Sequence, residues 1–350
     1  MIRVLIVDDS LATRSAIRRA LSEQADFEVL RPAANGTVAL QRVEQDAPDV
    51  VVLDIEMPGI DGLQVLDAIS IRKPEVPVIM FSGLTEQGAS TSLDALARGA
   101  IDVMAKPASS EELPHTMTLL AARIREIGSQ IISSRQAPSE NDRRGRHTGA
   151  EVQAVVVGVS TGGPNALMDL LPRFSSDFPV PILVVQHMPP LFTRQLAERL
   201  DRRTALTVSE AADGDVITGG HVLIAPGGRH MGVTSIRGEK VVKLTDTPRQ
   251  NSCRPAVDVL FETAADCYGP NALGVVLTGM GQDGLIGSES LVAAGSAVLA
   301  QDEASSVVWG MPGAVVRKSL ATRVLPLPMI AGEVDRRVRG GHVPQEQETS

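Results

Sequence analysis

The chain opens with MIRVLIVDDS, residues 1–10, in which the apolar run 2–7 is followed directly by Asp8 and Asp9. An uninterrupted run of Val, Ile and Leu is typical of a parallel β-strand that helices cover on both faces. Similar runs, separated by amphipathic stretches, lie at residues 50–53, 76–81 and 101–104, with a weaker one near Val29. This βα alternation predicts an α/β fold with a doubly wound parallel sheet and right-handed crossovers.

The same alternation resumes after a polar segment. Residues 133–150 are rich in Ser, Arg and Gly and read as a linker. Further apolar runs follow at 180–185, 222–224, 273–278 and 297–300. We therefore expect a first domain over residues 1–125, a helix end and linker over 126–150, and a second α/β domain over 151–345 with a doubly wound, mostly parallel sheet. After about residue 330 the chain turns polar and is expected to fray.

The composition excludes several classes of protein. Of the 350 residues 43% are hydrophobic and 21% charged, which is ordinary for globular domains. The formal net charge of −9 argues against a nucleic-acid binder. Cys253 and Cys267 are too few for a disulfide framework and are not in metal-ligand spacing. We expect a cytoplasmic protein without direct membrane insertion, because the chain begins with a strand and has no run of roughly 20 apolar residues.

Polar side chains follow the predicted strands of the first domain where each strand ends. These are Asp8 and Asp9 after the first strand, Asp54 after the third, Ser82 after the fourth and Lys106 after the fifth. The carboxyl ends of parallel strands meet at one edge of a sheet, so these groups are expected to converge. For any single aspartate there, a helix cap or a turn is the favoured interpretation, but the whole set favours a site. Clustered carboxylates suit Mg²⁺, and a carboxylate beside Mg²⁺ and a lysine can accept a phosphoryl group.

This part of the sequence resembles the response-regulator receiver family, whose fold is a flavodoxin-like doubly wound sheet. The resemblance covers about residues 1–125 and rests on Asp8-Asp9, LDIEMPGIDG at 53–62, Ser82 and Lys106-Pro107. It implies that Asp54 is the phosphoacceptor, with Mg²⁺ as the cofactor of phosphorylation. The residues implied to hold Mg²⁺ are Asp8, Asp9, Asp54 and Glu56, the last through its carbonyl. Ser82 and Lys106 are implied to sense the phosphoryl group.

Two details of the resemblance concern the surroundings of the lysine. Many receivers carry an aromatic residue three positions before it, where this chain has Val103, so the route by which the signal leaves the pocket stays open. Lys106-Pro107 is a candidate for a cis peptide bond, which X–Pro sequences adopt at modest cost.

The second domain begins with a nucleophile candidate. Residues 158–162 read GVSTG, which places Ser160 in the G-x-S-x-G spacing of a strand-to-helix nucleophile elbow. Backbone N–H groups at the start of the following helix could stabilise an oxyanion. The segment has no lysine for a P-loop and lacks the G-x-G-x-x-G of a dinucleotide loop. From the pentapeptide alone, a catalytic elbow and a tight structural turn are equally good interpretations.

A serine nucleophile needs a base and a group that orients the base. Among six histidines, His187 follows a predicted strand and is the best candidate for the base, whereas His230 is expected to lie in a glycine-rich turn. Asp283 follows another predicted strand within a glycine-rich loop, with Asp258 and Asp302 as alternatives for the orienting carboxylate. The order Ser, His, Asp differs from the Ser, Asp, His of α/β-hydrolases, which indicates a convergent triad.

Taken together, the two halves look like the chemotaxis protein-glutamate methylesterase/protein-glutamine glutaminase (CheB) family, in which a receiver precedes a methylesterase domain. The supporting motifs, which extend over nearly the whole chain, are GVSTGG at 158–163, QHM at 186–188, RPAVD at 254–258, TGMGQDG at 278–284, AQDE at 300–303 and WGMP at 309–312. The resemblance implies Ser160 as nucleophile, His187 as base and Asp283 as orienter, with the Met280 N–H as oxyanion donor. It implies no cofactor for ester hydrolysis.

The implied function is phosphorylation-activated hydrolysis of glutamate methyl esters on the cytoplasmic helices of a methyl-accepting chemoreceptor, with deamidation of glutamines by the same route. The implied phosphodonor is a histidine kinase of the chemotaxis type. A second class stays open, in which the chain is a phosphorylation-dependent binding or scaffold module of a related signalling array. A DNA-binding regulator is disfavoured, because the second domain is acidic and has no basic recognition helix.

Overall fold

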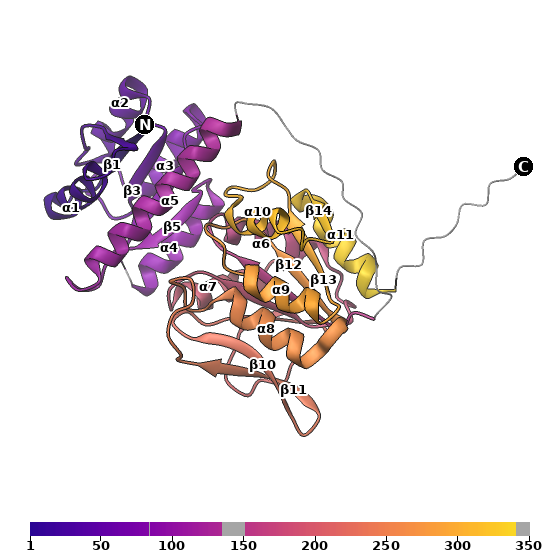
Figure 1. Cartoon of the computed structure of the whole chain (residues 1–350). Helices are drawn as coiled ribbons and strands as arrows, with labels where there is room; N and C mark the ends of the chain where they lie inside the picture. The colour runs from indigo at the N-terminus through magenta and orange to yellow at the C-terminus, as the bar shows by residue number, and fades with distance from the viewer. Residues whose placement is uncertain (84, 135–150, 341–350) are drawn as a thin grey trace, which may run out of the picture. The chain divides into compact units, whose positions relative to one another are not determined.

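The computed structural model describes residues 1–83, 85–134 and 151–340 of the chain. It divides into two compact units, Met1–Ser139 and Glu140–Ser350 (Figure 1). Most of the expected linker, 135–150, and the end of the chain, 341–350, lie outside the described residues, as do His147 and His342. Within the described part, none of the helices combines the length and hydropathy that a bilayer crossing needs.

The first unit is a five-stranded parallel sheet with helices between its strands, which confirms the flavodoxin-like prediction. The strand order is β2-β1-β3-β4-β5. The strands are β1 (Ile2–Val7), β2 (Phe27–Val29), β3 (Val50–Asp54), β4 (Val78–Ser82) and β5 (Asp102–Ala105). The helices are α1 (Leu11–Ser22), α2 (Gly36–Asp46), α3 (Gly62–Arg72), α4 (Glu86–Ala97) and α5 (Leu113–Ser134).

Local sequence explains where these helices begin. The side chains of Ser10, Asn35, Asp61 and Thr85 accept hydrogen bonds from the first turns of α1, α2, α3 and α4. Strands β3 and β4 are buried along their whole length, as their apolar runs predict. The sheet reverses its order between β1 and β3, so the residues that follow these two strands lie at the switch point where ligands bind in such folds.

The second unit contains a seven-stranded sheet in the order β14-β13-β12-β6-β7-β9-β8, with every neighbouring pair parallel. This confirms a doubly wound parallel sheet. The strands are β6 (Ala154–Val159), β7 (Ile182–Gln186), β8 (Thr207–Glu210), β9 (His221–Ile224), β12 (Ala272–Val276), β13 (Ala297–Gln301) and β14 (Arg323–Leu325). The helices are α6 (Gly163–Leu170), α7 (Phe192–Asp201), α8 (Val257–Tyr268), α9 (Leu285–Ala293), α10 (Gly310–Arg317) and α11 (Leu327–Val338).

Several local expectations were wrong. His230 is the fully buried first residue of the antiparallel hairpin β10 (His230–Ile236) and β11 (Glu239–Thr245), and does not lie in a glycine-rich turn. Residues 327–338 form α11 and do not fray, because Ile330 and Val334 pack into the interior. Among the described residues the cis peptide bond is Arg254-Pro255, and the bond between Lys106 and Pro107 is not cis.

Candidate active site

Ser160 directly follows β6, in the middle of the seven-stranded sheet. Its N–H donates to the carbonyl of Thr278 at 3.0 Å, which ties it to the chain that follows β12. Gly162 has a φ of +77°, a left-handed conformation that glycine adopts without steric cost, and it caps α6. At Gly158 the packing leaves no room for a side chain, because a Cβ there would lie 2.3 Å from Cγ1 of Val257. Residues 158–162 therefore form a tight strand-to-helix turn.

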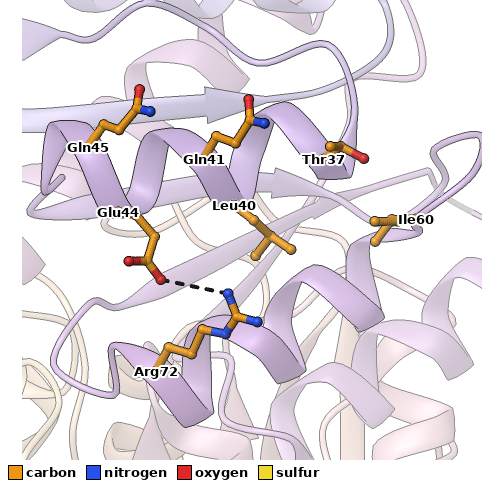
Figure 2. A pocket seen from close by; sticks show the side chains of 7 residues that line it. All are labelled: Thr37, Leu40, Gln41, Glu44, Gln45, Ile60 and Arg72. Carbon is orange, nitrogen blue, oxygen red and sulfur yellow. Dashed lines mark ion pairs between the residues drawn. The ribbon is translucent and has the colours of Figure 1, made fainter.

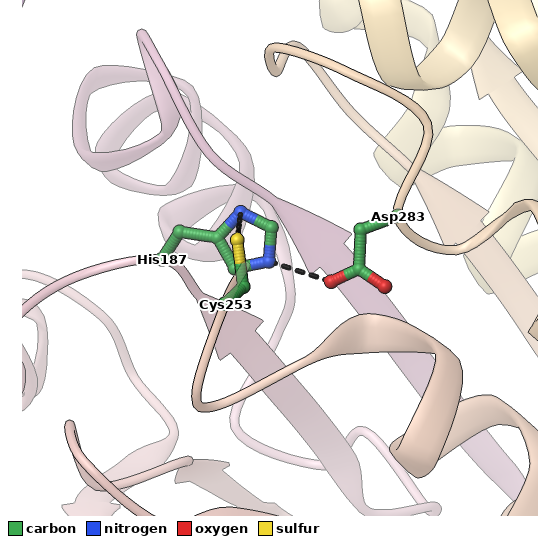
Figure 3. A group of neighbouring side chains, drawn as sticks. All are labelled: His187, Cys253 and Asp283. Atoms are coloured by element: carbon green, nitrogen blue, oxygen red, sulfur yellow. Dashed lines mark hydrogen bonds and ion pairs between the residues drawn. The ribbon is translucent and has the colours of Figure 1, made fainter. Parts of the chain in front are cut away.

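His187 and Asp283 are in direct contact at the same edge of the sheet. His187 follows β7, which pairs with β6, and Asp283 lies in the loop between β12 and α9. Nε2 of His187 and Oδ2 of Asp283 are 2.7 Å apart, and the two side chains are 8% and 2% exposed (Figure 3). Two side chains that lie 96 residues apart in the sequence therefore meet at this edge, as their positions after predicted strands led us to expect.

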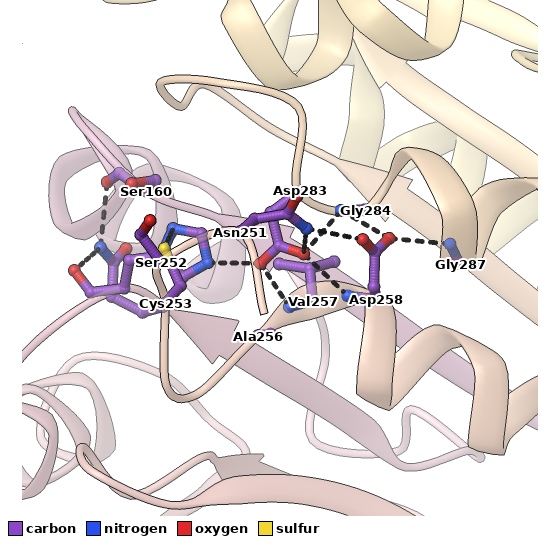
Figure 4. Close-up of polar contacts among 12 residues, drawn as sticks. Ser160, Asn251, Ser252, Cys253, Ala256, Val257, Asp258, Asp283, Gly284 and Gly287 are labelled. Atoms are coloured by element: carbon purple, nitrogen blue, oxygen red, sulfur yellow. Dashed lines mark hydrogen bonds and ion pairs between the residues drawn. The ribbon is translucent and has the colours of Figure 1, made fainter. Parts of the chain in front are cut away.

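The carboxylate of Asp283 is held by backbone groups at the start of α8 (Figure 4). Its Oδ2 accepts from Val257 N at 2.7 Å, and its Oδ1 accepts from Asp258 N at 3.1 Å and Gly284 N at 3.0 Å. Burial raises the pKa of Asp283, but the hydrogen bonds from His187 and from these amides outweigh it, and the net shift is downward. Asp283 is therefore ionised beside the imidazole, because a charged carboxylate suits both the helix N-terminus and the ring N–H.

Asp258, an alternative for the orienting carboxylate, does not contact His187. Its Oδ1 accepts from Gly284 N at 2.9 Å and Gly287 N at 2.8 Å, which holds the Asp283 loop against α8. Burial, with a smaller contribution from the charge of Asp283, raises the pKa of Asp258 to about 6. The other alternative, Asp302, accepts from the N–H and hydroxyl of Ser305 in its own turn.

Two further residues of this site were not predicted. Asn251 donates from Nδ2 to both Asp258 Oδ2 at 2.8 Å and Asp283 Oδ1 at 3.1 Å, so one amide bridges the two carboxylates. Cys253 places its Sγ 3.6 Å from Nδ1 of His187 (Figure 3). Both lie in the segment between β11 and α8, where no strand or helix pattern fixes their position.

The surroundings of His187 shift its pKa upward. Burial lowers the pKa of the imidazole, but the neighbouring Cys253 and Asp283 raise it by more, and the net result is a pKa raised to about 10. The protonated ring is the state that forms when a serine transfers its proton to a histidine. The backbone around the ring is held by Gln186, whose Nε2 donates to the carbonyl of Ser160 at 2.9 Å and to that of His187 at 3.4 Å.

Met280 lies two residues after Thr278 and is half-buried. The preceding Gly279 is packed against the nucleophile candidate, because a Cβ there would lie 2.9 Å from Cβ of Ser160. The loop that carries Met280 therefore passes close to Ser160. The use of the Met280 N–H as an oxyanion donor stays a prediction.

In the first unit, Lys106 joins two of the strand-end carboxylates. Its Nζ lies 2.9 Å from Oδ2 of Asp8 and 2.7 Å from Oδ2 of Asp54. Burial raises the pKa of Asp54, against the opposing effect of Lys106. One carboxylate oxygen from each of Asp8, Asp9 and Asp54 lies within 4.8 Å of the other two, a donor set that fits Mg²⁺.

The remaining predicted residues lie around this cluster. Ser82 is fully buried at the end of β4, with its Oγ 3.5 Å from the carbonyl of Gly83. Glu56 is exposed and donates its N–H to Asp54 Oδ1 at 3.3 Å. Val103 is buried in β5. The roles of Glu56 as a carbonyl ligand and of Ser82 as a phosphoryl sensor stay predictions.

A separate cavity of about 350 Å³ lies between α2 and α3 of the first unit (Figure 2). It is lined by the aliphatic Leu40 and Ile60 and by the pair Arg72 and Glu44, whose charged atoms are 3.7 Å apart. None of the predicted site residues lines it, so it is unrelated to either cluster.

Comparisons with known proteins agree with both halves of the chain. Residues 155–334 match the family described as CheB methylesterase, and residues 4–118 match the response regulator receiver domain. Proteins named protein-glutamate methylesterase/protein-glutamine glutaminase from Trichodesmium erythraeum and from a Nocardioides species are 45% and 46% identical. Each match covers 96% of this chain, with 99% and 95% of the relatives covered. The crystal structure of the Thermotoga maritima CheB methylesterase catalytic domain is 42% identical with a TM-score of 0.52, and the match covers 53% of this chain and 99% of that domain.

Proposed function

The chain belongs to the CheB methylesterase family, with a response-regulator receiver domain, and we propose that it hydrolyses glutamate methyl esters on the cytoplasmic helices of a chemoreceptor when Asp54 is phosphorylated. In this proposal residues 1–125 receive the signal and residues 151–345 cleave the ester. The observation that carries the hydrolase part is the 2.7 Å contact between His187 and Asp283, at the sheet edge that also holds Ser160.

The proposed reaction is acyl transfer through Ser160. Asp283 occupies Nε2 of His187, so the hydroxyl proton goes to Nδ1, the nitrogen that Sγ of Cys253 approaches at 3.6 Å in the structure. The hydroxyl oxygen attacks the ester carbonyl, and the oxyanion that forms is stabilised by backbone N–H groups, Met280 among them. Protonated His187 then gives its proton to the leaving methanol. Water, activated by the same imidazole, hydrolyses the acyl-enzyme and restores Ser160.

Deamidation of a glutamine side chain follows the same route and releases ammonia in place of methanol. Deamidation needs no residue beyond those named for ester hydrolysis. A carboxamide is a weaker electrophile than an ester, so we expect deamidation to be the slower of the two reactions. Rates measured side by side on one receptor segment, carrying either a glutamate methyl ester or a glutamine, test this order.

Control is proposed to begin at the Lys106 cluster. Asp54 accepts the phosphoryl group from a histidine kinase, and Lys106 contacts the transferred group. Asp8, Asp9 and Asp54 would hold Mg²⁺, which would supply positive charge to offset that of the phosphoryl oxygens. Lys106 lies 2.7 Å from Asp54 in the structure, which supports an ion pair that phosphorylation rearranges. A phosphodonor such as acetyl phosphate should raise the esterase rate of the wild type and leave that of Asp54→Asn unchanged.

The test of the hydrolase itself is methanol release from a methylated receptor fragment. Ser160→Ala should abolish it with an unchanged unfolding temperature, and the matched variant Ser209→Ala, at an exposed serine of β8, should keep the wild-type rate. A fluorophosphonate probe should label the wild type at Ser160. Methanol release by Ser160→Ala at the wild-type rate would remove Ser160 from the mechanism. A wild type that binds receptor without hydrolysis or labelling would instead favour a scaffold module.

A further inference from the structure

Three side chains of different chemistry converge beside the proposed nucleophile. His187, Cys253 and Asp283 each offer one ligand atom that lies within 4.8 Å of the other two (Figure 3). They come from the end of β7, the segment before α8 and the loop before α9, so their spacing in the sequence gives no sign of a metal site. Cys253 has no part in the proposed acyl transfer. The convergence therefore calls for a separate account.

We propose that this cluster binds a thiophilic divalent cation, with Zn²⁺ as the preferred metal, and that the bound metal reversibly inhibits the hydrolase. The inference rests on the proposed function, because it assigns regulation to the same site. The two metal ligands are Nδ1 of His187 and Sγ of Cys253. Asp283 acts from the second coordination shell.

The distance between the two ligand atoms fits a tetrahedral zinc site. With Zn–S near 2.3 Å and Zn–N near 2.05 Å, a tetrahedral angle separates the sulfur and nitrogen atoms by about 3.6 Å. The structure places Sγ of Cys253 3.6 Å from Nδ1 of His187. No backbone shift is needed to bring these two side chains to bridging distance.

Asp283 strengthens the site from the far side of the ring. Metal-bound histidines usually donate their other ring N–H to a carboxylate, which fixes the tautomer and raises the basicity of the ligating nitrogen. Asp283 is placed to do this, 2.7 Å from Nε2 and held by the amides of Val257 and Asp258. The donor pair of thiolate and imidazole suits Zn²⁺ better than Mg²⁺, which prefers oxygen ligands alone.

Inhibition follows because the metal is proposed to bind Nδ1 of the His187 ring. Nδ1 is the atom that must receive the proton of Ser160 in the proposed reaction, and a cation there blocks that transfer. Two protein ligands leave the other coordination positions to water, in contrast to the four ligands of a structural zinc site. The metal is therefore expected to bind reversibly.

The test uses the full chain with excess Mg²⁺, which occupies the carboxylate cluster of the first unit. Co²⁺ replaces Zn²⁺ as a spectroscopic probe, because a cysteine ligand produces a thiolate-to-cobalt charge-transfer band that carboxylates cannot give. Zn²⁺ affinity is measured by competition with a chromophoric chelator, and inhibition is expressed against the metal-free rate of each variant. The variants are Cys253→Ser and, as a matched control, Cys267→Ser, whose thiol donates to the carbonyl of Val233 away from the site.

We expect the band and the inhibition in the wild type and in Cys267→Ser. In Cys253→Ser the band should be absent and the zinc concentration for half-inhibition should rise at least about tenfold, since outer-shell changes alone cost about 10- to 100-fold in affinity. If the wild type is active but shows no charge-transfer band, or if zinc inhibits Cys253→Ser as strongly as the wild type, the metal site is refuted and the proposed hydrolysis is not. A wild type that shows the band but cleaves no ester leaves the metal site standing and refutes the proposed hydrolysis and its inhibition.

Discussion

Replacement of Asp283 by asparagine tests the proposed mechanism most directly, because it changes one charge and almost no volume. In the structure Oδ2 accepts from His187 and from Val257 N, and Oδ1 accepts from Asn251, Asp258 N and Gly284 N. An asparagine has one acceptor oxygen and one NH₂ group. Whichever position the NH₂ takes, it meets groups that are themselves donors.

The two orientations of the asparagine amide differ in how much folding stability they cost. This difference predicts which hydrogen bonds of the site are lost. An NH₂ at the Oδ1 position leaves three donors without an acceptor, whereas one at the Oδ2 position leaves only Val257 N unpaired and makes Nε2 of His187 accept, which is the wrong tautomer for the reaction. Each buried donor left unpaired costs about 1–3 kcal/mol, so the second orientation is favoured and costs about that much stability. That orientation also removes the acceptor for Nε2 of His187. Loss of the orienting carboxylate in a serine protease triad costs about 10⁴-fold in kcat, equivalent to about 5.5 kcal/mol, and we expect a loss of that order.

The assay is kcat for methanol release together with the thermal unfolding midpoint. Asp302→Asn is the matched control, because its remaining oxygen can still accept from Ser305, and it should change both quantities little. The mechanism requires Asp283→Asn to lose activity below its unfolding temperature. A folded Asp283→Asn with kcat within about tenfold of the wild type would refute the role of Asp283 as the orienting group.

Three further changes test other parts of the second unit. Burial raises the pKa of Glu333, but its ion pairs with Arg336 and Arg337 outweigh this and lower the pKa to about 2. In urea titrations the pairing should therefore contribute at most about 3 kcal/mol at pH 7, fading between about pH 4.5 and pH 2, and Glu333→Gln should lack that acid dependence. Gly158→Ala forces a methyl group against Val257 and should cost about 1–3 kcal/mol with a loss of kcat. Gln186→Met removes the side-chain donor to the carbonyl of Ser160 and leaves that carbonyl only the N–H of Gly163, so it should lower kcat about tenfold or more, with KM little changed.

The sequence predicted those parts of the site that depend on strand ends. Parallel strands must bring their carboxyl ends to one edge, so a polar residue directly after an apolar run has a nearly fixed place. This rule located Asp8, Asp54 and Lys106 in one cluster and brought His187 to Asp283 in the other. It did so without any knowledge of how the chain runs between strands.

The rule fails where the chain leaves the sheet. Asn251 and Ser252 have positive φ values of 49° and 63°, so this segment takes a path that no periodic pattern describes. Asn251 and Cys253 reach His187 and Asp283 only because of that path. The β10–β11 hairpin was missed for a related reason: β10 packs on α8 and is buried from His230 to Val233, so its residues do not alternate as a half-exposed strand would.

The start of α8 connects the nucleophile and the orienting carboxylate. The N–H of Val257 donates to Asp283, while the side chain of Val257 fills the space that Gly158 leaves beside β6. A shift of this helix end would move Asp283 and also press on the strand that precedes Ser160. Because a packed core does not deform continuously, the site is expected to be either assembled or disassembled as a unit. The Gly158→Ala variant should therefore disturb the His187–Asp283 pair although it touches neither residue, and a normal imidazole N–H resonance in that variant would show that the coupling is absent.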